Sequence, residues 1–386
     1  MRQAALRFGV KASVYYGKGD IRVESVPDPE IKDPTDALVR ITHACICGSD
    51  LWFYRGYERD WKPGFRTGHE WMGVVEEVGK EVKTVKKGDW VLAPFAFSDG
   101  KCEFCEKGLF TSCVHGGFWG GENLGGQAEA IRAPFADGTL VKIPESAGGD
   151  DAVLTRLLPL TDVMGTGYHS VVSANLRAGK TIIVIGDGAV GLCAVLSARI
   201  LGAERIILMG HNPDRLKLGQ RFGATDIIST RAKAPPGYEQ VSPPPELSRT
   251  TSWAGFHLGL AINDAQAMAE AVQMTGGGAE SVAECVGLKS SFDLAIGVAR
   301  PGGVVGFVGV PHVTEAIDLG RMFSQNISLR GGVAPVRAYI PDLMDQVLAG
   351  KIDPSPVLEM SVDLEGVPGG YAAMDSRKKI KVMVRP

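Results

Sequence analysis

The sequence predicts an α/β protein with two domains, one rich in strands and one built on a doubly wound parallel sheet. The chain has 386 residues, more than one hydrophobic core usually serves. Its first part is typical of short strands between Gly and Pro turns, whereas strands and helices alternate from about residue 150. The last residues are again strand-like. We therefore predict one domain from 1–160 and 336–386, with the other, 161–335, inserted between.

The strands of the first domain are short and helical periodicity is weak there. We expect them at residues 13–16, 37–42, 72–78 and 90–94, and a last one at 380–384. Short strands bounded by turn residues are typical of an all-β or barrel-like unit.

In the second domain, apolar strands alternate with helical runs. The expected strands are 181–185, 205–209, 226–228, 281–284 and 304–308, and the expected helices are 189–201, 214–222, 264–274 and 290–299. This alternation with short connections predicts a parallel sheet covered on both faces. The proline-rich stretch 231–262 interrupts it, and loops of this length are usually functional or disordered.

The bulk composition excludes several classes of partner. A formal net charge of -3 offers no basic field for nucleic acid or for an anionic membrane surface. No apolar stretch approaches the roughly 20 residues that cross a bilayer, and the first residues do not resemble a signal peptide. The seven cysteines are an odd number, and three of them cluster. We therefore expect a cytoplasmic protein with thiolate ligands rather than a disulfide framework.

A glycine-rich turn, Gly186-Asp187-Gly188-Ala189-Val190-Gly191, follows the strand 181–185 and opens a helix. In such a turn Gly186 allows the bend, Gly188 lets the backbone approach a pyrophosphate, and Gly191 lets the helix pack on the strand. Free N–H groups at the start of the helix, at Ala189 and Val190, favour the negative charge of a phosphate. The pattern predicts a dinucleotide-binding Rossmann domain. The insert 231–262 then either contacts the adenine end of that nucleotide or is, as we expect, a surface loop.

The residues after the second strand bear on the choice of cofactor. An NAD site usually has a carboxylate there, whereas this chain has Gly210. Without that charge a 2′-phosphate is not repelled, and His211, Asn212 and Arg215 can donate hydrogen bonds to it, which favours NADP over NAD. The alternative is that Arg215 stacks near the adenine and Asp214 serves NAD.

Asp99, Cys102, Cys105 and Cys113 form a compact set of possible metal ligands. Four tetrahedral ligands leave no open position, which is typical of a structural zinc. The alternatives are a reduced loop without metal and, for the fourth ligand, His115 in place of Asp99.

Three further segments together resemble one family. Gly68-His69-Glu70-Trp71-Met72-Gly73, Cys47-Gly48-Ser49-Asp50 and Thr161-Asp162 are similar to the ligand segments of zinc-dependent medium-chain alcohol dehydrogenases. The resemblance covers residues 13–385, apart from the insert. It implies a GroES-like catalytic domain beside the Rossmann domain.

The resemblance also implies a catalytic zinc held by Cys47, His69 and Asp162, with Glu70 able to occupy or vacate the fourth position. Three protein ligands and an open site are the pattern of catalytic zinc. The implied reaction is reversible hydride transfer between a small primary or secondary alcohol, or a polyol, and NADP(H). Ser49 would pass the substrate proton, and Asp50 would orient His69.

Two departures from the family affect details of this expectation. Trp52 stands where many relatives have a proton-relaying histidine, and Asp99 replaces a more usual cysteine. The alternatives are a sugar or aldehyde dehydrogenase of the same superfamily and a non-catalytic nucleotide-binding relative. Because relatives associate through an edge of the nucleotide-domain sheet, we expect a homodimer or homotetramer, with the apolar run 304–310 at that edge.

Some nearby side chains are better explained by packing. His43 and Cys45 share a strand face with Cys47, since side chains alternate along a strand. We expect both to pack rather than to bind metal. Phe95, Phe118 and Trp119 are expected in an aromatic core, with a substrate wall as the alternative.

Overall fold

The computed structural model describes residues 9–57, 61–121, 124–230, 262–312 and 315–386. The chain divides into two compact units: unit 1 is Met1–Gly165 with Pro335–Pro386, and unit 2 is Thr166–Ala334. The sequence placed the domain limits at 160/161 and 335/336. The predicted insert 231–262 lies outside the described residues except for Ile262, which begins a helix.

Unit 1 is built mainly of strands, and apart from α12 its helices are short. Its strands are β1 (Lys11–Gly17), β2 (Asp20–Ser25), β3 (Ala37–Ile46), β4 (Phe65–Arg66), β5 (Glu70–Val78), β6 (Trp90–Ala93), β7 (Ala96–Phe97), β8 (Gly117–Phe118), β9 (Ala130–Ala133), β10 (Val141–Lys142), β17 (Leu358–Asp363) and β18 (Lys381–Arg385). Its helical segments are α1 (Asp50–Tyr54), α2 (Glu103–Glu106), η1 (Phe110–Ser112), α3 (Ala136–Thr139), α4 (Asp151–Leu157), η2 (Leu158–Thr161), α12 (Val336–Leu348), η3 (Ser355–Val357) and α13 (Val367–Asp375).

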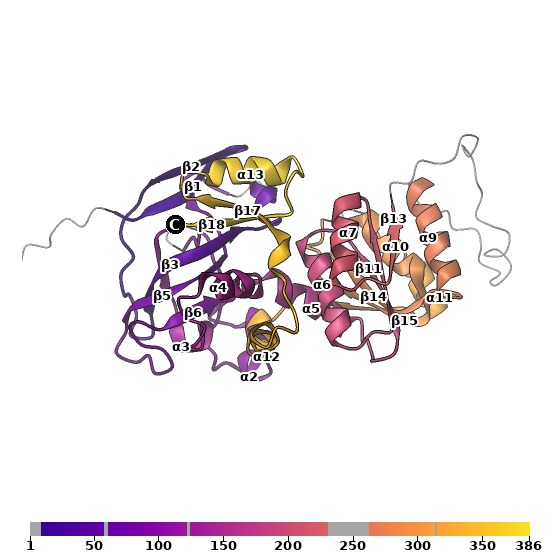
Figure 1. Cartoon of the computed structure of the whole chain (residues 1–386), viewed down its shortest axis with the longest axis horizontal. Coiled ribbons are helices and arrows are strands. Elements are labelled where there is room, and N and C mark those ends of the chain that lie inside the picture. The colour runs from indigo at the N-terminus through magenta and orange to yellow at the C-terminus, as the bar shows by residue number, and fades with distance from the viewer. Residues whose placement is uncertain (1–8, 58–60, 122–123, 231–261, 313–314) are drawn as a thin grey trace, which may run out of the picture. The chain divides into compact units, whose positions relative to one another are not determined.

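The main sheet of unit 1 brings the C-terminal strand next to an N-terminal one. Its order is β10-β6-β5-β3-β18-β17, with β9 also paired to β3. β18 runs antiparallel to β3, with Val382 opposite Ile46, and in Figure 1 the yellow β18 lies beside the indigo β3. A second sheet has the order β2-β1-β4, and β7 pairs with β8.

The core of unit 1 explains why these segments pair. Alternate residues of β3, such as Val39 and Ile41, are buried, as the period of a half-covered strand requires. They belong to one apolar cluster with Trp71 of β5 and Tyr371 of α13. Burial of each large apolar side chain contributes about 1.5–3 kcal/mol, so this cluster holds the C-terminal segment to the N-terminal strands.

Unit 2 contains the strand–helix alternation that the sequence predicted. Its strands are β11 (Thr181–Ile185), β12 (Arg205–Gly210), β13 (Asp226–Ser229), β14 (Ala279–Glu284), β15 (Ala299–Phe307) and β16 (Ser328–Gly331). Its helices are α6 (Ala189–Ile200), α7 (Pro213–Phe222), α9 (Ile262–Met274), α10 (Lys289–Val298) and α11 (Leu319–Gln325), and α5 (Val163–Ser173) crosses the limit between the units. No helix in the described part of the chain is long and apolar enough to cross a membrane.

These strands form a parallel sheet in the order β13-β12-β11-β14-β15-β16. Helices α6 and α7 lie on one face and α9 and α10 on the other (Figure 1). The α/β fold class predicted from the sequence is therefore confirmed.

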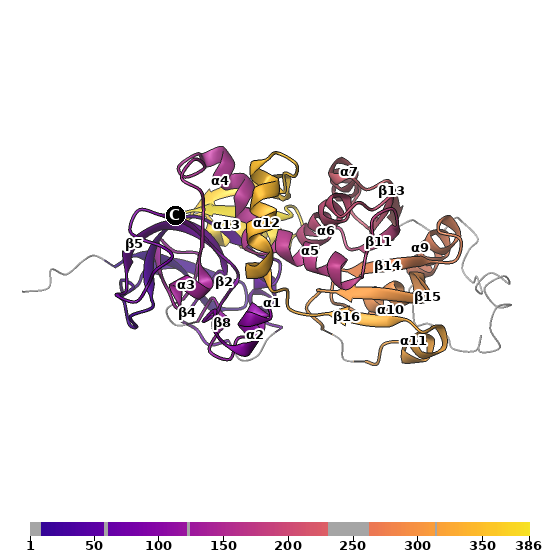
Figure 2. The same ribbon diagram turned by 90° about the horizontal axis from the view of Figure 1, so that it is seen from below.

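One expectation about this sheet was wrong. The apolar run 304–310 begins in β15, which lies between β14 and β16, so it is not the edge. Figure 2 shows β14, β15 and β16 side by side, with β16 outermost. Inner strands of a parallel sheet are apolar because both of their faces are covered, and that property misled the assignment.

Candidate active site

Side chains from three parts of unit 1 converge at one end of its main sheet. Cys47 follows β3, His69 precedes β5, Glu70 begins β5, and Asp162 lies between η2 and α5. Because β3 and β5 are paired with Cys45 opposite Glu70, the ends of the two strands are adjacent. One ligand atom of each of the four residues lies within 4.8 Å of those of the others. Asp162 Oδ2 lies 3.4 Å from Cys47 Sγ and 3.3 Å from His69 Nε2.

The donor atoms of this cluster fit a zinc ion. A thiol, an imidazole and carboxylates are the ligand types that zinc takes in proteins. Burial raises the pKa of the Cys47 thiol to about 11, so a neighbouring cation is needed to make it a thiolate near neutral pH. Glu70 Oε2 is buried without a hydrogen-bond partner, which costs free energy unless a cation is bound there.

Asp50 contacts the imidazole of His69 at Nδ1, the ring nitrogen that faces away from Asp162. Its Oδ1 lies 3.2 Å from His69 Nδ1, and its Oδ2 accepts the N–H of Cys47 at 2.9 Å. Burial lowers the pKa of His69, but Asp50 and Cys47 raise it by more, so it stands well above its usual value. Ser49, the residue before α1, has its Oγ 3.5 Å from His69 Nε2. This geometry leaves Nε2 directed at the cluster, as the expected role of Asp50 requires.

Lys381 is part of this site, and the sequence reasoning missed it. Its ammonium group donates to Glu70 Oε1 and lies 3.5 Å from the carbonyl oxygen of Ile46. The side chain of Lys381 is 1% exposed and that of Glu70 is 0% exposed. Burial lowers the pKa of Lys381, but its acidic neighbours, Glu70 first, raise it by more, so the pKa of Lys381 stands well above its usual value. A lysine among the apolar residues 380–384 was the available signal, because a fully buried ammonium needs a charged partner.

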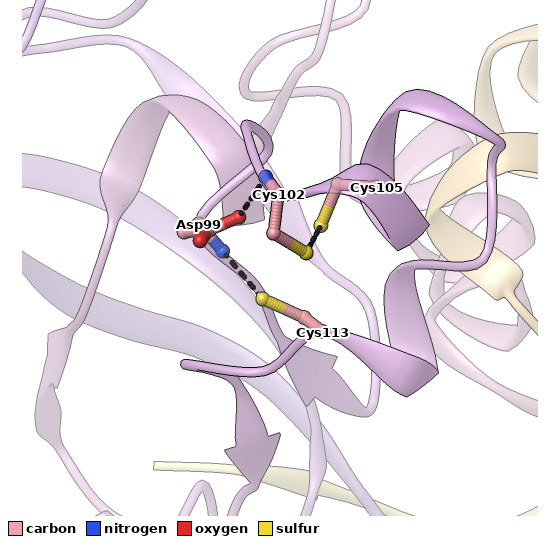
Figure 3. A group of neighbouring side chains, drawn as sticks. All are labelled: Asp99, Cys102, Cys105 and Cys113. Carbon is pink, nitrogen blue, oxygen red and sulfur yellow. Dashed lines mark hydrogen bonds between the residues drawn. The ribbon is translucent and has the colours of Figure 1, made fainter.

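A second cluster lies in the segment 99–113. Asp99, Cys102, Cys105 and Cys113 point toward one another, and their ligand atoms lie within 4.8 Å of one another (Figure 3). The sulfur atoms of Cys102 and Cys105 are 3.6 Å apart across the start of α2. Asp99 donates its N–H to Cys113 Sγ at 3.3 Å. The four ligands that the spacing predicted are thus brought together by one local turn.

His115 contacts this second cluster from outside. Its Nδ1 is 2.6 Å from Asp99 Oδ2, while Asp99 Oδ1 accepts the N–H groups of Lys101 and Cys102 at 2.8 and 3.0 Å. Burial raises the pKa of Asp99, but His115 and these N–H groups lower it by more, so Asp99 is a carboxylate. The structure groups Asp99 with the thiols and places His115 where it orients that carboxylate.

The neighbouring candidates pack, as expected. His43 Nε2 lies 3.1 Å from Asp151 Oδ1, and both His43 and Cys45 are outside the two clusters. Trp119 packs edge-on against Trp71, with ring centroids 5.0 Å apart, in the core of unit 1.

Of the other aromatic candidates of unit 1, Phe95 is buried as expected, whereas Phe118 and Trp52 reach the surface. The rings of Phe95 and Phe118 are stacked, but Phe118 is 57% exposed and so is not a core residue. Trp52, which stands in place of the histidine of relatives, lies in α1 with its ring centroid 5.6 Å from that of Tyr57.

The glycine turn of unit 2 lies between β11 and α6. Gly186 has φ +112°, a conformation that favours glycine, and a Cβ on Gly191 would overlap the carbonyl oxygen of Gly186. Gly188 precedes α6 and has open space around its Cα, so a ligand can approach the backbone there. Ala189 and Val190 open the helix with their N–H groups, as anion binding requires.

The loop after β12 has the residues assigned to the cofactor. Gly210 ends β12, and Asn212 caps α7 by accepting the N–H groups of Asp214 at 3.0 Å and Arg215 at 3.2 Å. The side-chain oxygen of Asn212 is therefore engaged, and its amide nitrogen is the group that can donate to a phosphate.

A buried thiol–imidazole–carboxylate cluster in one unit and a dinucleotide-type turn in the other define a class, the zinc-dependent nicotinamide oxidoreductases. Two family models match the chain: the alcohol dehydrogenase GroES-like domain at residues 33–145 and the zinc-binding dehydrogenase at residues 252–349. The chain belongs to the zinc-dependent alcohol dehydrogenase family of medium-chain dehydrogenases/reductases. The predicted resemblance is confirmed.

Individual relatives agree with this assignment. An uncharacterized zinc-type alcohol dehydrogenase-like protein, AdhB of Bacillus subtilis, is 33% identical over 98% of this chain and 100% of its own. A glutathione-independent formaldehyde dehydrogenase of Pseudomonas aeruginosa is 30% identical over 98% of both chains. The solved alcohol dehydrogenase TADH from Thermus sp. ATN1 is 30% identical and covers 97% of this chain and 99% of its own, with a TM-score of 0.82.

Proposed function

We propose that the protein is an alcohol dehydrogenase that transfers hydride reversibly between a small primary or secondary alcohol, or a polyol, and NADP(H). The observation that carries this proposal is the buried convergence of Cys47, His69, Glu70 and Asp162. A purely structural metal site is closed by its ligands, as in the segment 99–113, whereas here Glu70 is held back by Lys381. Three ligands and a withheld fourth leave a position for substrate.

The residues of the site have separate tasks. Cys47, His69 and Asp162 would hold the zinc, which supplies a Lewis acid that lowers the pKa of an alcohol. Asp50 keeps His69 in one orientation, and Lys381 holds Glu70 in place and offsets part of the rise in pKa that burial imposes on its carboxyl. The hydroxyl of Ser49 would accept the alcohol proton and pass it to water or to a ribose hydroxyl, because Trp52 has no basic group for that task.

NADP is the cofactor that the chain favours. The nicotinamide supplies the hydride acceptor, so the choice between NADP and NAD depends on the adenine end. Gly210 offers no carboxylate to the ribose, and the following loop carries His211, Asn212 and Arg215. The ratio of kcat/KM values with the two cofactors tests this point, and a clear preference for NAD would contradict it.

An aldehyde dehydrogenase activity is the second candidate. It is favoured by the relatives named glutathione-independent formaldehyde dehydrogenase and formaldehyde dismutase, at 30% and 32% identity. A sugar substrate is the other variant of this alternative, and a substrate panel separates them. A non-catalytic nucleotide-binding role is disfavoured, because such a protein has no need of an open metal site.

The same proposal includes a homodimer or homotetramer in the cytoplasm. The edge strand β16 offers unpaired backbone groups, and the helix α11 before it carries Phe323, which is 89% exposed. All seven cysteines are free thiols, which fits a reducing compartment. Light scattering on a size-exclusion column measures the mass, and a monomer at micromolar concentration would contradict the oligomer.

The decisive experiment compares wild type with Cys47→Ala. Turnover is followed by the absorbance of the reduced nicotinamide over a panel of alcohols, polyols and aldehydes. Cys47→Ala should abolish turnover and leave nucleotide affinity unchanged, because the turn at residues 186–191 is in the other unit. Cys193→Ala, which alters a buried thiol of α6 outside both clusters, is the matched control. Normal turnover in Cys47→Ala would overturn the assignment.

A further inference from the structure

Asp187, the residue between the first two glycines of the turn, is a buried carboxylate bonded to the next strand–helix loop. It is 4% exposed. Its Oδ2 accepts the backbone N–H of His211 at 2.8 Å and that of Asn212 at 2.7 Å. These are the first two residues after β12, and hydrogen bonds to a carboxylate are among the stronger ones in proteins. One side chain from the turn after β11 therefore sets the course of the loop that begins at the end of β12.

The same side chain also fills the space beside Gly210. A Cβ built on Gly210 would lie 2.6 Å from Asp187 Cβ, 2.7 Å from its Oδ2 and 2.8 Å from its Cγ. Separations of this size are far inside van der Waals contact, so any side chain at position 210 requires Asp187 to move. The position of Asp187 therefore requires glycine at position 210, so the absence of an acid there has a steric cause.

In an NAD site of this fold, a carboxylate at the end of the second strand holds the ribose hydroxyls. Position 210 is that place in this chain, and Asp187 prevents an acid from standing there. The charge of Asp187 is directed at two N–H groups, which offset it in part, so it is not a free substitute for the excluded carboxylate.

We propose that Asp187 is a specificity-determining residue for the cofactor. First, it excludes a ribose-binding carboxylate from position 210. Second, it fixes the backbone of His211 and Asn212, so that the loop leading to Arg215 has one conformation in which it can bind a 2′-phosphate. The second effect rests on the proposed use of NADP. The first effect, the exclusion of a side chain at position 210, rests on the geometry alone.

The test is a cycle of Gly210→Asp, Asp187→Ala and the double variant. Gly210→Asp alone should lower the thermal midpoint of the apoprotein and weaken binding of both NADPH and NADH, because its side chain meets Asp187. The double variant should regain the midpoint, and its ratio of NADH to NADPH affinity should rise at least tenfold over wild type. That factor is about what one charge-assisted hydrogen bond contributes. Affinities are measured by the fluorescence of the reduced nicotinamide.

Asp187→Ala alone tests the hold on the loop. It should weaken NADPH binding about tenfold, because two N–H groups lose their acceptor. Glu204→Ala removes an exposed carboxylate from the turn before β12 and is the matched control, with no change expected. Tighter NADPH binding in Asp187→Ala would overturn the inference, because Asp187 would then itself act as the ribose acid.

The stability measurements separate this inference from the proposed function. If Gly210→Asp lowers the midpoint equally with and without Asp187, the exclusion is wrong whichever cofactor the enzyme uses. If wild type binds NADH better than NADPH, the proposed NADP preference fails, and with it the second part of the inference. The exclusion at position 210 is then still decided by the midpoints.

Discussion

Replacing Lys381 by methionine tests its buried ion pair with Glu70. Lys381→Met keeps the length of the side chain but removes the ammonium that faces Glu70. Both side chains are almost fully buried, so Glu70 would lose the charged partner that offsets the cost of its burial. Removing one partner of a buried ion pair costs about 3–5 kcal/mol. Because a whole domain is stable by only about 5–15 kcal/mol, the change is easy to measure.

Urea unfolding in the presence of a chelator measures this loss without interference from bound zinc. Tryptophan fluorescence is a suitable signal, because the buried Trp71 and Trp119 both lie in the core of unit 1. The control is Lys11→Met, which breaks the exposed pair with Glu365 and should leave the midpoint unchanged.

The double variant Lys381→Met/Glu70→Gln sharpens the test. It leaves no buried charge at this position, so most of the lost stability should return. If Lys381→Met is as stable as wild type, or if the double variant is no better than Lys381→Met, the reasoning about a charged buried pair is refuted.

Three further predictions concern other parts of the chain. Cys113→Ser should remove one equivalent of zinc per chain and lower the thermal midpoint of unfolding, because a closed four-ligand site contributes directly to folding. Elemental analysis measures the zinc content and calorimetry measures the midpoint. An unchanged zinc content would contradict this prediction. Burial lowers the pKa of His43 below 6.5 despite its bond to Asp151, so the folded form resists protonation and loses stability as the pH falls below 6.5. Urea unfolding at a series of pH values measures this loss of stability. The contribution of His43 should be absent in His43→Gln, so identical pH profiles of wild type and variant would count against the prediction. Gly191→Ala should abolish nucleotide binding in calorimetric titration, because its methyl group would overlap the carbonyl oxygen of Gly186, and full affinity would rule out that close approach.

Local patterns in the sequence predicted much of the fold and one of the two clusters. The ligands of the segment 99–113 are close in sequence, so one turn brings them together and spacing was sufficient. The strand–turn–helix at residues 181–200 is equally local. For such segments, periodicity and turn residues determine the geometry, because few distant contacts are involved.

The cluster of Cys47, His69, Glu70 and Asp162 was predictable only in part. Cys47, His69 and Asp162 are far apart in the chain, and only the resemblance to a family united them before the structure was known. Lys381 escaped that route, because it lies 311 residues from its partner Glu70 and no ligand motif includes it. The pairing of β3 with both β5 and β18 is what makes these residues neighbours.

The sequence by itself determined the two-domain α/β class, the glycine turn and the grouping of Asp99 with three cysteines, because these depend on residues near one another in the chain. Tertiary structure alone decided that β16 rather than the run 304–310 is the sheet edge. It also decided that Asp187 accepts hydrogen bonds from the backbone N–H groups of the loop after β12. The reason is physical. Packing between elements that are distant in the chain determines which group pairs with a buried charge and which strand is left at the edge of a sheet. Local sequence patterns carry no information about that packing.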